Sequence, residues 1–189
     1  MTVLDGLLIL LGAVIIILCT MDGLLRALMM LLAFYLATTI AGMITLATDT
    51  LQNIAVALSR VTGGSGVPNM AITETIAFAS FAVPLFVGAY FLSKMAFPET
   101  TLPKLHALDN ILGLFAGVVL ALLIAAVIYN TWGVAVSVRW NNSQAWYRMQ
   151  VAYAGAFLRP YLHQVLAYYR PTLFLFDLLH YPPFFLPQS

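Results

Sequence analysis

A single run of apolar residues constrains this chain most strongly: after Asp109 no charged residue occurs until Arg139. A membrane-spanning helix needs about 20 apolar residues, because each residue advances an α-helix by about 1.5 Å across a hydrocarbon layer about 30 Å thick. This run is longer than that minimum. The sequence therefore predicts a transmembrane helix over residues 109–132, and Asp109 marks the end at which it enters the membrane.

The composition extends this prediction to the rest of the chain. Hydrophobic residues make up 62% of the 189 residues and charged residues only 8%, which is far from the averages of soluble domains. A net charge of +1 provides no basic field for nucleic acid. We therefore expect an all-α integral membrane protein that binds no nucleic acid and has no room for a soluble catalytic domain.

Three further apolar stretches predict three further spans, over residues 3–21, 25–48 and 71–93. A short turn separates the first two stretches. It contains Asp22 and Arg26, whose spacing of four residues allows them to pair on the first turn of the second helix. Glu74 falls in the first turn of the third span, where the helix dipole favours a carboxylate. The fold prediction is thus a bundle of four transmembrane helices, with Asp22, Arg26, Glu74 and Asp109 as helix-end charges.

Small residues within these spans predict where helices pack, because they allow two backbones to approach closely in lipid. Gly113 and Gly117 form such a pair in the fourth span, and Ala41, Gly42 and Gly88 are further candidates. Pro84 cannot donate the hydrogen bond of an interior helical residue, so a kink is expected there, with Gly88 relieving the crowding one turn later.

The remaining segments are expected at the membrane surface. Apolar residues recur with helical spacing over residues 49–59, which predicts a short amphipathic helix after the second span. After residue 132 the chain becomes rich in arginine and aromatic residues, a composition typical of the boundary between membrane and water. The candidate interfacial residues are Trp140, Trp146, Tyr147, Arg148 and Arg159. The chain is therefore divided into a four-span domain, 1–132, and an interfacial tail, 133–189, which contains further amphipathic helices.

No pattern of catalytic chemistry accompanies the spans. Enzymes and transporters that work inside membranes place ionisable side chains within their spans, whereas the charges here fall near span ends. The spacing of His106, His163 and His180 does not suggest a metal site. We expect no catalytic residue, no metal and no cofactor other than bound lipid, although the imidazole of His163 leaves open a bound pigment.

Residues 108–117 resemble the start of the last span in the colicin V production protein family, which reads Leu-Asp-x-x-x-Gly-x-x-x-Gly. Asp5 before the first span, and Gly23 with Arg26 in the first turn, are also similar to that family. The resemblance implies a four-span protein of the bacterial inner membrane, linked to toxin production or export and to maintenance of the cell envelope, without an established catalytic residue.

Two functions follow as hypotheses. The first is a scaffold or helper that acts through contacts with helices and lipids, as the resemblance implies. The alternative is an accessory subunit of a large membrane assembly, such as a respiratory or photosynthetic complex, whose tail clasps neighbouring subunits, lipid or pigment. A small transporter or channel is a third alternative. Both main hypotheses predict other membrane proteins, or further copies of this chain, as partners.

Overall fold

The computed structural model describes residues 2–46, 53, 70–97, 106–139, 143–173 and 182–186. Its long helices are α1 (Val3–Leu46), α3 (Met70–Ala96) and α4 (His106–Val136), followed by the shorter α5 (Ser143–Ala154) and α6 (Arg159–Tyr169). Two short 3₁₀ helices, η1 (Arg170–Thr172) and η3 (Pro183–Phe185), complete the described part of the tail. All regular structure in the described residues is helical, as the composition predicts.

Among the described residues, three helices are long and apolar enough to cross a membrane: α1, α3 and α4. The predicted count of four differs because the first two predicted spans are joined in one helix, α1, which has 44 residues. Gly23 interrupts α1 with φ 80° and ψ 177°, values outside the helical region. Residues 3–22 and 24–46 therefore form two arms with different directions, each of about the length that a span requires.

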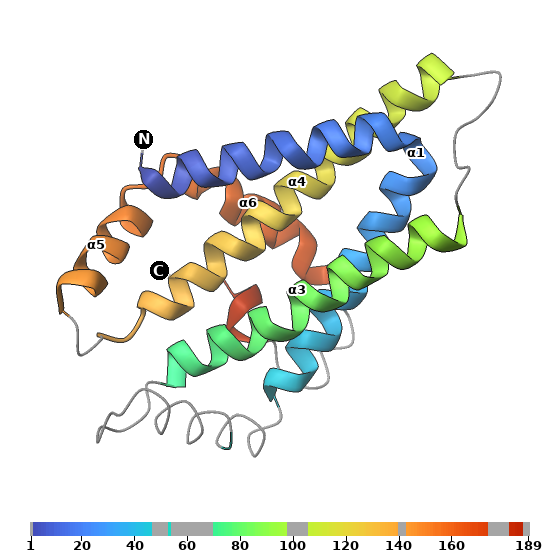
Figure 1. The fold of residues 1–189 in the computed structure, drawn as a ribbon. Coiled ribbons are helices and arrows are strands. Elements are labelled where there is room, and N and C mark those ends of the chain that lie inside the picture. The colour runs from blue at the N-terminus through green and yellow to red at the C-terminus, as the bar shows by residue number, and fades with distance from the viewer. Residues whose placement is uncertain are drawn as a thin grey trace.

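The two arms of α1 pack against the other long helices in turn (Figure 1). The first arm crosses α4, and after the bend at Gly23 the second arm descends beside α3. Helices α1 and α4 form the most extensive pair in the molecule, and α1 with α3 the next. Away from these contacts, each of the three helices exposes large apolar side chains. Examples are Leu10, Phe91 and Phe115, which are 64%, 59% and 63% exposed. A lipid environment covers such surfaces without a hydrophobic penalty.

Parts of the C-terminal tail pack against the long helices. Helix α6 lies along α4, and η3 also contacts α4. Phe184 and Phe185 are fully buried, and the ring of Phe184 stacks on that of Phe78 in α3 at 4.5 Å between centroids. Because α4 continues to Val136, the predicted boundary at residue 132 falls inside a helix. The predicted surface helix 49–59 lies outside the described residues, apart from Asn53.

Candidate functional site

The bend of α1 is capped by an aspartate from another helix. When a helix restarts after a break, its first backbone N–H groups have no helical partner. Here the Leu24 N–H donates to Oδ1 of Asp109 at 3.0 Å, and Asp109 is only 1% exposed. Gly23 is required at the bend for two reasons: its positive φ disfavours any residue with a Cβ, and a Cβ there would overlap the Asp109 carboxylate. Asp109 therefore acts as an N-cap supplied from α4 to the second arm of α1.

The two glycines that follow Asp109 bring α4 against the first arm of α1. A Cβ at Gly113 would lie 2.6 Å from the carbonyl oxygen of Cys19, and one at Gly117 would lie 2.7 Å from the Cys19 Cβ. Real Cβ atoms essentially never approach so closely. Asp109, Gly113 and Gly117 are spaced four residues apart and so share one face of α4. The predicted small-residue face thus contacts a helix of the same chain.

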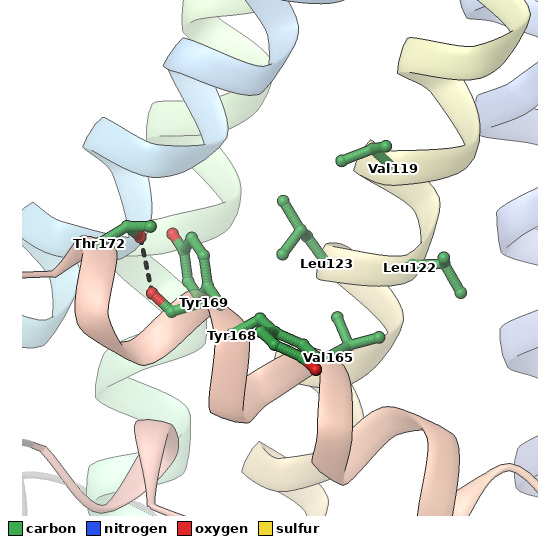
Figure 2. Close-up of a pocket in the computed structure, with 7 residues that line it drawn as sticks. All are labelled: Val119, Leu122, Leu123, Val165, Tyr168, Tyr169 and Thr172. Atoms are coloured by element: carbon green, nitrogen blue, oxygen red, sulfur yellow. Dashed lines mark hydrogen bonds between the residues drawn. The ribbon is translucent and has the colours of Figure 1, made fainter.

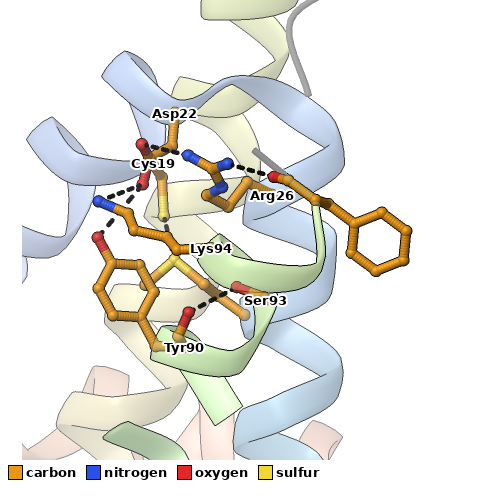
Figure 3. Close-up of polar contacts among 8 residues, drawn as sticks. Cys19, Asp22, Arg26, Tyr90, Ser93 and Lys94 are labelled. Carbon is orange, nitrogen blue, oxygen red and sulfur yellow. Dashed lines mark hydrogen bonds and ion pairs between the residues drawn. The ribbon is translucent and has the colours of Figure 1, made fainter. Parts of the chain in front are cut away.

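A cluster of charged side chains lies beside the bend (Figure 3). Arg26 donates to Asp22 at 3.0 Å and to the backbone carbonyl of Phe97, just past the end of α3, at 2.8 Å. Lys94 lies 4.0 Å from Asp22 and 4.8 Å from the centroid of the Tyr90 ring. Arg26 is 8% exposed, so this guanidinium is shielded from solvent and held by both partners. The cluster, which we call the elbow cluster, fixes the end of α3 to the bend of α1.

A second buried aspartate links the start of the chain to the tail. Asp5 is fully buried and accepts hydrogen bonds from the backbone N–H groups of Phe157 and Leu158 at 3.1 and 3.2 Å. It also accepts from the backbone and the hydroxyl group of Thr2 at 2.7 and 3.0 Å. Phe157 and Leu158 directly precede α6, so Asp5 satisfies donors at the start of that helix. Asp5 and Asp109 therefore serve the same purpose at opposite ends of the first arm of α1.

Polar side chains of α4 and α1 hold the rest of the tail. Asn130 is fully buried and donates to the carbonyl oxygens of Phe184 and Leu186 at 2.6 and 2.8 Å. The hydroxyl groups of Thr38 and Tyr169 lie 2.7 Å apart. Since both contacts fall within long apolar helices, they bind the tail inside the bundle, where an unpaired polar group is costly.

An apolar groove separates part of α4 from α6 (Figure 2). Its volume is about 310 Å³. The lining residues are Val119, Leu122, Leu123, Val165, Tyr168, Tyr169 and Thr172. A groove with this lining suits a hydrocarbon chain better than a polar substrate.

Other predicted packing residues have mixed surroundings. Ala41 is fully buried, at 0% exposure, and Gly42 is also buried. Gly88 is different, because a Cβ there would meet no described atom within 4 Å. The structure thus does not place Gly88 at a close helix contact. Helix α3 continues across Pro84 without a break. The predicted place of Glu74 in the first turn of this helix is wrong, because α3 begins at Met70 and its first turn contains no acidic residue; the Glu74 side chain is half-buried.

The predicted interfacial residues lie on and around α5. Trp146 donates through Nε1 to the carbonyl of Val136 at 3.0 Å. Tyr147 and Arg148 are exposed, and Arg159 lies over the ring of Tyr153 at 5.8 Å. Trp140 lies outside the described residues.

His163 is the tail histidine that the structure describes. Its ring lies 5.8 Å from that of Tyr129, and its Nε2 is buried without a hydrogen-bond partner among the described residues. Burial lowers the pKa of His163 below its usual range, and the nearby positive charge of Arg159 lowers it further. In the described part of the chain, no group of three His, Cys, Asp or Glu side chains is arranged to hold a metal ion.

Sequence reasoning did not assign the structural roles of Asp5, Gly23 and Asn130. The sequence indicates Asp5 as a helix-end charge and Gly23 as part of a turn, and both as points of family resemblance, but it does not identify their partners. Asn130 did carry a signal, since it is an amide inside an otherwise apolar helix, and such residues need a buried partner.

Comparison with known proteins agrees with this organisation. A family model described as "Colicin V production protein" matches residues 4–166, which include every long helix as well as α5 and most of α6. No curated protein and no solved structure matches the chain. The predicted family is confirmed, and the chain is a membrane protein that belongs to the colicin V production protein family.

Proposed function

We propose that this chain is a non-enzymatic scaffold or helper protein of the bacterial inner membrane, with a role in export or in maintenance of the envelope. The two arms of α1, together with α3 and α4, form four spans in this proposal. The chain acts through the surfaces that its packed helices present to lipids and to other membrane proteins. Lipid covers the exposed apolar faces of the spans.

The use of the two buried aspartates is the observation that carries this proposal. Buried carboxylates inside membrane proteins often carry protons or bind substrates. Here Asp5 and Asp109 accept backbone hydrogen bonds at helix starts, which is a task of holding helices in place. Both oxygens of Asp5 and Oδ1 of Asp109 are thus engaged in holding helices, while Oδ2 of Asp109 is buried without a hydrogen-bond partner among the described residues.

Replacement of Asp109 separates a structural role from a chemical one. In Asp109→Asn the amide oxygen still accepts from Leu24, but the side chain no longer carries a proton or charge. We expect this variant to keep most of its abundance in the membrane and its function, measured as colicin V export and tolerance to detergent in cells that lack the native chain. Asp109→Ala loses the cap and is expected to lower abundance and function together. Normal abundance of Asp109→Asn without function would instead assign chemistry to this carboxylate.

The four-span arrangement is tested by labelling introduced cysteines with a membrane-impermeant maleimide. Cys19 is fully buried, so it contributes little background. Four spans place Thr2→Cys and Gln144→Cys on one side of the membrane and Met95→Cys on the other. If α1 crossed the membrane only once, the chain would cross three times in total and Thr2→Cys would lie on the opposite side from Gln144→Cys.

The alternative, an accessory subunit of a larger membrane assembly, is supported by the outer face of α6. Gln164 and Tyr168 are exposed there, Tyr168 at 83%, although α6 lies beside residues in the middle of α4. Polar groups at this level are better matched by a neighbouring protein than by lipid. Purification in mild detergent distinguishes the two functions: a stable large complex supports the subunit role, and a particle of one to a few copies of this chain supports the scaffold.

A further inference from the structure

Helix α5 has one face against the bundle and one face that nothing described covers. Tyr153 is buried and Trp146 is bonded to the end of α4, so these side chains define the inner face. Tyr147 and Val151 are 63% and 50% exposed, and at 100° per residue they lie together on the opposite face. Helix α5 is therefore amphipathic, with an apolar ridge directed away from the protein.

Two exposed arginines lie near this ridge. Arg148 is exposed and follows Tyr147 on the helix, about 100° around the axis. Arg139 is also exposed and lies over the ring of Trp146, with 6.0 Å from its guanidinium carbon to the ring centroid. Trp146 belongs to the inner face of α5, so Arg139 lies where α5 meets the end of α4. An apolar ridge with exposed guanidinium groups near it is typical of a helix that lies in a membrane surface.

The carboxylates described at this end of the molecule do not neutralise these arginines. Asp5 is fully buried and its oxygens are engaged with Thr2 and the start of α6. Glu74, near the start of α3, is half-buried. The bend of α1 presents the opposite case, since Asp22 lies within 4.0 Å of both Arg26 and Lys94. In the described part of the chain, Arg139 and Arg148 are thus exposed without an ion pair, unlike Arg26 and Lys94 at the bend.

From this placement we propose that the outer face of α5 binds the headgroups of anionic phospholipids, with Arg139 and Arg148 contacting the phosphates and Tyr147 and Val151 entering the layer between headgroups and acyl chains. The inference rests on the membrane-spanning arrangement proposed above. Lipid is favoured over a protein partner because a surface helix next to the end of a span lies at headgroup level. Anionic headgroups complement the positive charges of Arg139 and Arg148.

The test measures which lipids surround α5 in vesicles. The full chain with Ala154→Cys, an exposed position on α5, carries a fluorophore at that cysteine. The vesicles are zwitterionic phosphatidylcholine with a small, equal fraction of spin-labelled phosphatidylglycerol or spin-labelled phosphatidylcholine. We expect stronger quenching by phosphatidylglycerol, and we expect this preference to fall about fivefold for each arginine changed to glutamine, because each basic residue near a charged surface contributes about that factor. High salt lowers the preference as well.

Two controls separate charge from folding and location. Arg139→Lys with Arg148→Lys keeps both charges and is expected to retain most of the preference. A fluorophore at Met95→Cys, at the other end of the bundle, is expected to show little preference, since the charges near it are paired. The proposal is overturned by equal quenching by the two lipids at position 154, by a preference that survives both Arg→Gln changes, or by a label that neither lipid quenches, which would mean that protein covers this face. Correct cysteine topology with any of these results would leave the four-span proposal intact.

Discussion

Replacement of Gly113 by alanine tests the close contact between α4 and the first arm of α1. The added Cβ would lie 2.6 Å from the Cys19 carbonyl oxygen and 3.0 Å from the backbone carbon of Gly23, and both of these are main-chain atoms that no side-chain rotation can move. To restore ordinary contact at 3.4 Å, the helices must separate by roughly 0.8 Å, which forfeits a quarter to a half of the dispersion energy of the displaced contacts. We expect a net destabilisation of about 2 kcal/mol, within the usual range for overpacking.

The lone cysteine reports this change directly. Cys19 is fully buried and lies beneath both Gly113 and Gly117, so a thiol reagent reaches it only when α1 and α4 open. Destabilisation of the closed state by about 2 kcal/mol raises the open population, and hence the labelling rate, about 30-fold. The measurement is maleimide labelling of the purified protein in mild detergent.

The matched control for this prediction is Gly88→Ala. This change adds the same methyl group to another long helix, where it meets no described atom within 4 Å. Its labelling rate is expected to equal that of the wild type, or to be lower, because alanine favours helix over glycine by about 1 kcal/mol. A rate for Gly113→Ala within twofold of the wild type would refute the argument that backbone contact, and not merely composition, holds these helices together.

Three further predictions concern the bend, the tail and its histidine. In Gly23→Ala the positive φ costs about 1–2 kcal/mol because alanine has a Cβ, and that Cβ would also overlap the Asp109 carboxylate. We therefore expect a lower midpoint of thermal unfolding in detergent than for the wild type. An unchanged midpoint would contradict this. Asp5→Ala leaves the N–H groups of Phe157 and its neighbour unpaired, so hydrogen exchange at these two amides should quicken by at least tenfold, whereas Asp5→Asn, which keeps an acceptor, should show a smaller increase. The folded state lowers the pKa of His163 and so favours its neutral form; stability is therefore complete above the unfolded pKa near 6.5 and declines as pH falls through that value towards the lower folded pKa. Thermal unfolding between pH 7.5 and 5 measures this decline in stability. His163→Gln should make the decline smaller. If the wild type showed no decline, the imidazole would be fully hydrated in the folded state.

The long helices follow from local patterns in the sequence, and the contacts between their ends do not. Hydropathy locates the apolar stretches because lipid compatibility is a property of each segment. Likewise Asp22 and Arg26 are predicted to pair from their spacing alone, and they do so at 3.0 Å. By contrast, Phe157 and Leu158, the partners of Asp5 in the tail, lie more than 150 residues from it, and no periodicity in the sequence connects them.

The number of spans shows the same division between local and long-range information. Hydropathy separates the first two apolar stretches at Asp22. It does not show that both stretches belong to α1, which is interrupted only at Gly23. That geometry depends on Gly23 adopting a positive φ and on Asp109 accepting the exposed N–H of Leu24. The role of the tail was likewise hidden, because arginine and aromatic residues indicate a membrane surface, whereas Asn130 and Tyr169 bind parts of the tail inside the bundle.

The cap that Asp5 provides has a consequence for the order in which the molecule is made. Asp5 leaves the ribosome more than 150 residues ahead of Phe157 and Leu158, which supply two of its four donors. At about 5–20 residues per second, those donors follow roughly 8–30 seconds later. For that interval the newly inserted first helix carries a carboxylate without its final partners. A chain that stops before Phe157 keeps Asp5 with Thr2 as its donor and without the two backbone donors of the tail, so an unfinished copy differs from a finished one at this carboxylate.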